Sequence, residues 1–316
     1  ADKDHAIRMF LGNGLRPDIW DGVVERYDVG IFEFYGATEG NVTMLNPYGM
    51  AHAVGYMPPL LQKILPYSLV KFDLEREAPV RNAEGFCERV KPGEVGEAIG
   101  QIKADDPVTE FRGYTNKEAT AKKLLENVYT QGDRFFRTGD LLRMDEQGFV
   151  YFVDRIGDTF RWKGENVATT EVSEVINLVK GIKESIVYGV EVPGHDGRAG
   201  MAALVLGEGF EVDTLSHSLE EQLPAYARPV FLRVLPEPDL TGTFKHQKSR
   251  LKTDGYSLEL EDKIYMRDAS TGRYSELTEE GVASLSAGAR IWYVLAISLR
   301  RLSCQTEAAA VHAHRQ

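Results

Sequence analysis

The chain has 316 residues, of which 43% are apolar, 10% aromatic and 27% charged. This composition excludes disorder as an overall description, and the length predicts about two domains of roughly 150 residues each. The 37 Lys and Arg residues against 48 Asp and Glu give a formal net charge of -11. A broad basic face that binds nucleic acid is therefore not expected, and any anionic ligand is expected to be held locally.

The cysteines and the apolar runs narrow the class of protein further. Cys87 and Cys304 lie far apart and supply neither a disulfide framework nor a zinc-ligand cluster, so we expect a reducing, intracellular compartment. The longest apolar run, residues 291–299, is much shorter than the ~20 residues that span a bilayer, and no transmembrane helix is expected. The chain opens without an initiator Met or a signal segment, and we expect it to begin inside a longer sequence.

The first part of the chain, residues 1–110, is rich in Gly and Pro with short apolar runs. Short strands and turns are expected there, including strands at 29–35 and 95–102. A polar surface helix is predicted over residues 117–125, with Asn116 as its N-cap.

Two hairpins are predicted around the middle of the chain. In the first, aromatic and β-branched runs at 135–145 and 149–153 flank a Gly turn. The second, residues 160–166, also has a Gly at its tip. Between them, Gly157 gives the backbone the dihedral freedom that a hinge needs, so we place the domain boundary at residues 154–158.

Residues 158–255 are predicted to form a complete α+β domain. Thr170 is expected to cap a helix whose apolar residues recur at i, i+3, i+4 and i+7 and which stops near Gly181. A second helix is expected over 214–223, capped by Asp213. Three strands are expected in this domain, at residues 185–192, 200–206 and 229–235.

Residues 35–40 and 138–140 could carry chemistry. The first segment combines a ring, glycines, a hydroxyl and a carboxylate, which can stack on a purine, approach a phosphate and hold a hard cation; taken alone, an ordinary strand-ending turn explains it better. In the second, Gly139 inside an aromatic strand marks either the close approach of a ligand or a β-bulge. Asp140 suits the two hydroxyls of a ribose.

Charged residues give two further candidates. Arg155 is expected to be buried between two carboxylates, whereas Arg161 and Lys163 fit an exposed sheet edge. Residues 241–248 are predicted to be a loop that ends in a basic cluster, and a solvated charged face explains such a run by itself. A single Lys on a flexible loop, here Lys245, is nevertheless the group expected where a carboxylate and a phosphate must meet despite their repulsion.

Five segments, in this order and spacing, resemble the fatty acid transport protein and very long-chain acyl-CoA synthetase family of the adenylate-forming (AMP-binding) superfamily. The resemblance covers about residues 7–289, and its most distinctive part is 154–171 (DRIGDTFRWKGENVATTE). The other segments are 12–17 (GNGLRP), 33–41 (EFYGATEGN), 136–141 (FRTGDL) and 241–245 (TGTFK).

This resemblance implies an adenylate-forming enzyme fold of the α+β or α/β class. Residues 1–157 would be the closing portion of the large AMP-binding domain, with a sheet and a distorted barrel, and residues 158–255 a small mobile C-terminal α+β domain. Residues 256–289 would be a family-like extension and 290–316 a divergent tail.

The resemblance also implies a function: ATP- and Mg²⁺-dependent ligation of a long or very long-chain fatty acid to CoA, coupled to fatty acid uptake. The fatty carboxylate attacks the α-phosphate of ATP, and the CoA thiol then displaces AMP from the acyl-adenylate. Both steps concentrate negative charge. The implied locations are the endoplasmic reticulum, the peroxisome or the periphery of the plasma membrane, with membrane association possible for a full-length protein.

By resemblance, individual residues take named roles. The nucleotide site comprises Gly12, Asn13 and Gly14 at the adenine, Tyr35 stacked on the base beside Gly36 and Ala37, Thr38 at phosphate, Asp140 at the ribose hydroxyls, and Arg155 at ribose and phosphate. The remaining roles are Glu39 as Mg²⁺ ligand, Lys245 as bridge between acyl carboxylate and α-phosphate, Gly157 as hinge, and Lys163, Gly164 and Glu165 in the loop of the CoA tunnel.

One part of the family pattern is missing. Its Ser/Thr/Gly-rich phosphate loop does not precede Gly12, so we expect a fragment of a longer protein or a truncated gene product, with little activity alone. The alternative is a non-catalytic fatty acid uptake or membrane-associated lipid-binding protein that keeps the fold. One observation argues against a non-catalytic protein: the residue types that the chemistry needs are all present, at Glu39, Asp140, Arg155 and Lys245.

Overall fold

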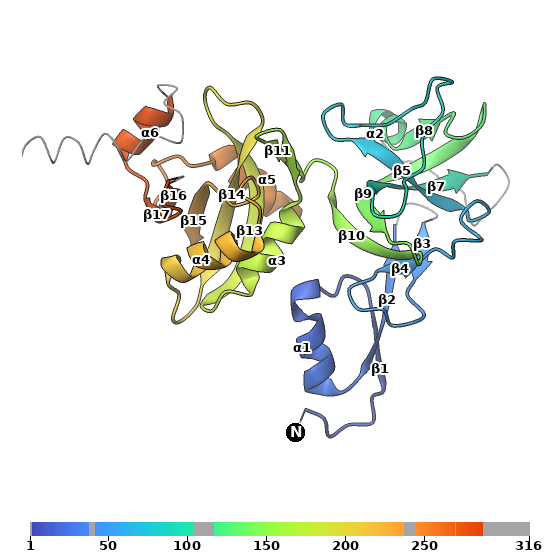
Figure 1. Cartoon of the computed structure of the whole chain (residues 1–316), viewed down its shortest axis with the longest axis horizontal. Helices are drawn as coiled ribbons and strands as arrows, with labels where there is room; N and C mark the ends of the chain where they lie inside the picture. Colours follow the sequence, from blue (N-terminus) through green and yellow to red (C-terminus); the bar gives the residue numbers. More distant parts are fainter. Residues whose placement is uncertain (1, 38–41, 104–116, 237–243, 269, 287–316) are drawn as a thin grey trace, which may run out of the picture. The chain divides into compact units, whose positions relative to one another are not determined.

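The computed structural model describes residues 2–37, 42–103, 117–236, 244–268 and 270–286. The chain divides into two compact units, Ala1–Thr159 and Phe160–Gln316, and each is described by itself (Figure 1). Within the described ranges, no helix combines the length and the apolar character that crossing a bilayer requires.

The first sheet of unit 1 is centred on β2 (Gly30–Gly36). Strand β1 (Met9–Gly12) pairs with β2 in parallel, and β3 (Thr43–Leu45) pairs with it antiparallel. Helix α1 (Pro17–Tyr27) connects the two parallel strands (Figure 1). Because parallel strands end at the same edge of a sheet, the segment after β1 lies beside the end of β2.

The second sheet of unit 1 is antiparallel. Its strands are β4 (Gly55–Tyr56), β5 (Tyr67–Asp73), β6 (Ala78–Pro79), β7 (Val95–Ile102), β8 (Leu124–Glu126), β9 (Arg134–Met144) and β10 (Phe149–Arg155). Their order is β4-β10-β9-β7-β5-β6, with β8 paired to β9 and helix α2 (Lys117–Lys122) just before β8. Among the described residues β4 and β6 do not pair, so the part of the fold expected as a distorted barrel is an open sheet.

Unit 2 is an α+β unit. Its elements are the hairpin β11 (Phe160–Trp162) and β12 (Glu165–Val167), the strands β13 (Ile182–Glu191), β14 (Arg198–Leu206), β15 (Phe231–Leu235), β16 (Lys263–Arg267) and β17 (Tyr274–Glu276), and the helices α3 (Thr169–Asn177), α4 (Val212–Gln222), α5 (Phe244–Asp254) and α6 (Glu279–Ser286). Strands β13 to β17 form one sheet in chain order, in which only the β14–β15 pair is parallel. Helices α3 and α4 lie side by side on one face of this sheet (Figure 1).

One contiguous apolar core stabilises unit 2. Trp162, Tyr188 and Phe231 are its largest fully buried side chains, and they come from the hairpin, β13 and β15. The core also includes Ile264 on β16 and Leu285 on α6. The residues expected as a family-like extension therefore continue both the sheet and the core of this unit.

The strand predictions agree with the structure, whereas two helix predictions need correction. The hairpin β9–β10 and the hairpin β11–β12 are confirmed. The expectation of only strands and turns before residue 110 is wrong at α1, where Pro17 stands at the helix start, Asp18 in the first turn and Trp20 on the buried face. The helix predicted over 117–125 ends at Lys122, because the residues after it pair with β9 as β8.

Both helix caps predicted in unit 2 are wrong by about two positions. Ala168 is the N-cap of α3 and Glu211 the N-cap of α4, and the side chain of neither accepts a capping hydrogen bond. Thr170 and Asp213 therefore lie within the first turns. The helices begin earlier than their best capping side chains because their buried faces, which include Thr169 on α3, fix where each helix packs. Asn116, the predicted cap of α2, lies outside the described residues.

Candidate functional site

The segment predicted to line the adenine site follows β1 and is held by a buried carboxylate. Gly12 ends β1, opposite Glu33 in the parallel pairing with β2. The Glu33 carboxylate accepts the backbone N–H groups of Gly14 and of Leu15, the latter at 3.1 Å. Gly14 has a φ of +87°, which favours glycine, and Asn13 is exposed beside it. The loop is thus fixed at its base with Asn13 facing solvent.

Glu33 is a candidate functional residue to which the sequence analysis assigned no role. It is 1% exposed, and its second oxygen, Oε2, is buried without a hydrogen-bond partner in the part of the chain that is described. A buried acceptor without a donor is costly, so this oxygen is a candidate acceptor for a ligand N–H group. The signal in the sequence is a Glu in an apolar strand, on the same buried face as Ile31 and Tyr35.

Three of the predicted nucleotide-binding residues meet, although they come from three different strands. Tyr35 lies on β2, Asp140 on β9 and Arg155 on β10. The Tyr35 hydroxyl donates to Asp140 Oδ2 at 2.6 Å, and Arg155 Nε lies 3.6 Å from Asp140 Oδ1. Because the Asp140 side chain is 18% exposed, its carboxylate lies between a buried phenol and solvent.

The electrostatics of this cluster keep Tyr35 a hydrogen-bond donor. Burial, and then the Asp140 carboxylate, raise the pKa of Tyr35 far above its ordinary value of 10.0. Its hydroxyl therefore remains protonated at neutral pH and orients Asp140. A carboxylate has about four acceptor positions, so Asp140 can accept further hydrogen bonds, such as those of two adjacent hydroxyls.

The expectation that Arg155 is buried between two carboxylates is wrong. Its side chain is 63% exposed, whereas the preceding residue, Asp154, is 2% exposed. Asp154 accepts the backbone N–H of Arg155 at 2.8 Å and the Thr159 hydroxyl at 3.1 Å. Successive residues of a strand face opposite sides of the sheet. Arg155 therefore reaches Asp140 across the hairpin.

Two of the predicted phosphate and metal residues, Thr38 and Glu39, lie outside the described residues. The positions before them are described: Gly36 ends β2, and the Ala37 N–H donates to the carbonyl of Val42 at 3.1 Å. Within the described ranges, no group of three or more His, Cys, Asp or Glu is placed to hold a metal ion. The assignment of Glu39 as a Mg²⁺ ligand therefore stays a prediction.

Lys245 lies in the first turn of α5, not on a loop as predicted. Residues 241–243, the first of the predicted segment, lie outside the described residues, as does the Lys245 side chain. The helix itself is anchored to α3, because the Lys248 ammonium donates to the Thr169 hydroxyl at 3.0 Å. The backbone of Lys245 is thus carried by a helix that is attached to the body of unit 2.

The hairpin predicted to line a CoA tunnel has a sharp tip in unit 2. Lys163 and Gly164 have φ values of +55° and +84°, and Glu165 opens β12. Burial, and then Arg267, lower the pKa of Lys163. Next to the tip, the ring of Trp162 is buried and stacks on another ring, so the base of the hairpin is fixed while its tip is polar.

The predicted hinge residue, Gly157, lies in the turn after β10 with a φ of +86°. A Cβ atom built there would meet nothing within 4 Å. The requirement for glycine at this position is therefore one of backbone conformation and not of space.

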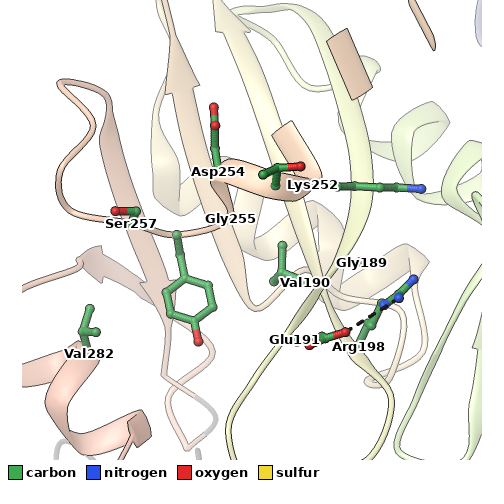
Figure 2. Close-up of a pocket in the computed structure, with 11 residues that line it drawn as sticks. Gly189, Val190, Glu191, Arg198, Lys252, Asp254, Gly255, Ser257 and Val282 are labelled. Carbon is green, nitrogen blue, oxygen red and sulfur yellow. Dashed lines mark ion pairs between the residues drawn. The ribbon is translucent and has the colours of Figure 1, made fainter. Parts of the chain in front are cut away.

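Unit 2 also contains a cavity of ≈ 520 Å³ that none of the predicted site residues lines (Figure 2). Its walls come from the ends of β13 and β14, the end of α5 and the residues after it, and α6. Glu191 and Arg198 form an ion pair in it at 3.7 Å, and Lys252 and Asp254 add one charge of each sign. These charges give the cavity no preference for an anionic or a cationic ligand.

Comparisons with known proteins identify the family. The AMP-binding enzyme C-terminal domain matches residues 171–245. Long-chain fatty acid transport protein 2 of Rattus norvegicus is 44% identical over 284 residues, which are 88% of this chain and 45% of the relative. Long-chain fatty acid transport protein 1 of Mus musculus is 43% identical over 291 residues, 91% of this chain and 45% of the relative. The chain belongs to the fatty acid transport protein family.

Solved structures show the same fold for this family member. MatB of Rhodopseudomonas palustris with bound ATP aligns with a TM-score of 0.58 and 24% identity, over 78% of this chain and 45% of that chain. The o-succinylbenzoate CoA synthetase of Bacillus subtilis, in complex with an acyl-adenylate, aligns with a TM-score of 0.56 and 22% identity, over 74% of this chain and 44% of that chain. The fold is that of the adenylate-forming enzymes, and the chain spans about 45% of the length of these curated relatives.

Proposed function

We propose that this chain carries the nucleotide-binding part and the mobile C-terminal domain of an ATP-dependent ligase that joins a long or very long-chain fatty acid to CoA. The observation that carries the proposal is the meeting of Tyr35, Asp140 and Arg155 in a member of the fatty acid transport protein family. Two solved structures of the same fold, one with bound ATP and one with an acyl-adenylate, support the same chemistry.

In this proposal the cluster binds the nucleoside of ATP. The ring of Tyr35 is the proposed stacking partner of adenine. Asp140, already oriented by the Tyr35 hydroxyl, accepts hydrogen bonds from the two ribose hydroxyls. The side chain of Arg155 is exposed, and contact with ribose and phosphate oxygens would cost it only a weak 3.6 Å ion pair.

The proposed chemistry needs cations where negative charges meet. A fatty carboxylate oxygen attacks the α-phosphorus of ATP, and the bond to pyrophosphate breaks; the CoA sulfur then attacks the acyl carbon, loses its proton, and AMP leaves. Lys245 is the proposed cation between carboxylate and α-phosphate. Gly157 is the proposed hinge, and the tip Lys163–Glu165 the proposed wall of the CoA tunnel. Mg²⁺, with Glu39 as its proposed ligand, would neutralise phosphate charge when bound.

The second candidate function is fatty acid uptake or membrane-associated lipid binding without turnover. The names of the relatives, which are transport proteins, favour it. Nucleotide affinity separates the two functions, because a pure lipid carrier has no use for ATP.

Titration calorimetry of the chain with ATP and Mg²⁺ tests the proposal. We expect binding that falls about tenfold or more in Asp140→Ala, since a charged acceptor of hydrogen bonds is lost. Glu126→Gln is the control and should bind ATP normally, because it removes an exposed carboxylate on β8, a strand of the same sheet. Absence of nucleotide binding, together with binding of fatty acid, would favour the lipid carrier. We also expect no acyl-dependent exchange of pyrophosphate into ATP by this chain alone, and robust exchange would refute the importance of the missing phosphate loop.

A further inference from the structure

We propose that Glu97, on β7, is the positioning residue that sets the conformation of residues 138–140 and thereby aims the Asp140 carboxylate. This inference deepens the proposed function and rests on it only where Asp140 is taken to hold ribose. No motif in the sequence marks Glu97 as part of the site. In the structure, Glu97 contacts residues 138–140 directly, and its side chain is 1% exposed.

The Glu97 carboxylate binds β9 on both sides of Thr138. Arg137 donates to it three times, from Nε to Oε1 at 3.1 Å and to Oε2 at 3.0 Å, and from Nη2 to Oε2 at 2.7 Å. The backbone N–H of Gly139 donates to Oε1 at 3.3 Å. One buried side chain thus fixes the residues that immediately precede Asp140.

On the β7 side of β9, regular strand pairing does not supply this constraint, whereas on the other side Asp140 pairs with Arg155 of β10. In the β7–β9 ladder Ile99 pairs with Arg137 and Glu97 with Leu141, so residues 138–140 face the single residue Ala98. These three residues form a bulge, with Gly139 at a φ of +83°. A bulge leaves backbone groups without ladder partners, and other groups must bind them.

Side chains around the bulge form hydrogen bonds with these backbone groups. The Thr138 hydroxyl donates to the Ala98 carbonyl at 2.8 Å and accepts the Asp140 N–H at 3.0 Å. Lys123 Nζ donates to the Thr138 carbonyl at 2.8 Å. Glu97 is the only charged acceptor in this set among the described residues, and the Gly139 N–H is the donor that it satisfies.

The arrangement depends on an intact ion pair. Burial raises the pKa of Glu97, and the Arg137 guanidinium opposes that shift. If either partner is changed, a charge stays behind in a site that is nearly closed to water, and the donors around it must find other acceptors. The position of Gly139, and with it the direction of Asp140, then relaxes.

Glu97→Gln tests the proposal, with Glu126→Gln as the matched control. Glu126 forms an ion pair with Arg134 on the same strand, at 3.6 Å, but both side chains are at least half exposed. Amide hydrogen exchange should become roughly tenfold or more faster at Gly139 and Asp140 in Glu97→Gln, and stay unchanged in the control. Unchanged protection at these two amides, or an equal loss along the whole ladder, would overturn the proposal.

Nucleotide discrimination gives a second measurement. If Asp140 holds ribose, the wild-type chain should bind ATP on the order of tenfold more tightly than 2′-deoxy-ATP, because a hydroxyl on a charged acceptor is lost. In Glu97→Gln this ratio should fall below about threefold. A purely structural role would weaken both nucleotides equally and leave the ratio intact, which would overturn the proposal.

The proposal can still be tested if Glu97→Gln is unstable or if the chain does not bind nucleotide. If Glu97→Gln does not fold, Arg137→Lys keeps the positive charge but loses the two-pronged contact, and the same two measurements apply to it. If the wild-type chain binds neither nucleotide, the proposed function fails. Hydrogen exchange at Gly139 and Asp140 still decides whether Glu97 positions the bulge.

Discussion

The hydrogen bond between Tyr35 and Asp140 should be measurable as a coupling energy. Tyr35→Phe removes the hydroxyl that donates to Asp140 Oδ2 at 2.6 Å and keeps the ring. A hydrogen bond to a charged group contributes ~1.5–3 kcal/mol. Because Asp140 retains some access to water and its ion pair with the exposed Arg155, we expect a loss near the lower end, about 1.5 kcal/mol.

A double-mutant cycle isolates this term. Urea unfolding of the wild type, Tyr35→Phe, Asp140→Asn and the double variant should give a coupling of ~1–2 kcal/mol. Tyr129→Phe is the matched control, since its hydroxyl bonds the neutral Ser68 hydroxyl at 2.7 Å. A neutral pair is about half as strong, so its loss should be smaller. A coupling indistinguishable from zero would refute the geometry of the cluster.

The pH dependence of the same variant provides an independent check. The pKa of Tyr35 is raised in the folded protein above its ordinary value of 10.0, so the contribution of this residue is complete below pH 10 and is lost as the pH rises further. The stability difference between wild type and Tyr35→Phe should therefore be constant below pH 10 and shrink above it. A difference that grows above pH 10 would contradict the assignment.

Three further predictions concern the bulge, the core of unit 2 and the proposed cation. Gly139→Ala should lower the free energy of unfolding by ~1–2 kcal/mol, and slightly more than Gly157→Ala, because both need a positive φ but only the first has a neighbour, an ammonium 3.3 Å from the added Cβ; equal losses in urea melts would argue against crowding at the bulge. Arg233→Met should cost ~3–5 kcal/mol by thermal unfolding, because the 4% exposed guanidinium pairs with two carboxylates, whereas Arg250→Met, with an 80% exposed side chain, should cost less than about 1 kcal/mol. In a full-length protein, Lys245→Ala should lose formation of the acyl-adenylate and retain thiolysis of supplied acyl-adenylate; equal loss of both half-reactions would contradict its assigned role.

Local patterns in the sequence were sufficient for much of the secondary structure. The aromatic runs around a Gly turn predicted the β9–β10 hairpin, and the polar, Gly-tipped run predicted β11–β12. Such local patterns predicted the wrong element where pairing with a distant strand outweighs helix propensity. Leu124 and Leu125 are good helix formers, yet they pair with Phe136 and Phe135 as strand β8, because burial against β9 outweighs a few tenths of a kcal/mol of helix preference.

The candidate site shows the same division. The motif segments predicted that Tyr35, Asp140 and Arg155 belong to one nucleotide site, and the structure brings them together. The sequence could not reveal that Arg155 is exposed while Asp154 is buried, because the face on which each residue of a strand lies depends on what the sheet packs against.

The amino-acid sequence was sufficient to predict the family, the order of the segments and the residue types that the proposed chemistry needs, because these are properties of single positions and their spacing. The buried carboxylates that support these residues could be identified only from the folded chain. Glu33 and Glu97 lie within strands and carry no motif of their own. Their importance comes from what other strands place against them: the N–H groups of Gly14 and Gly139. A buried acceptor is defined by its donors, and those donors are far away in the sequence.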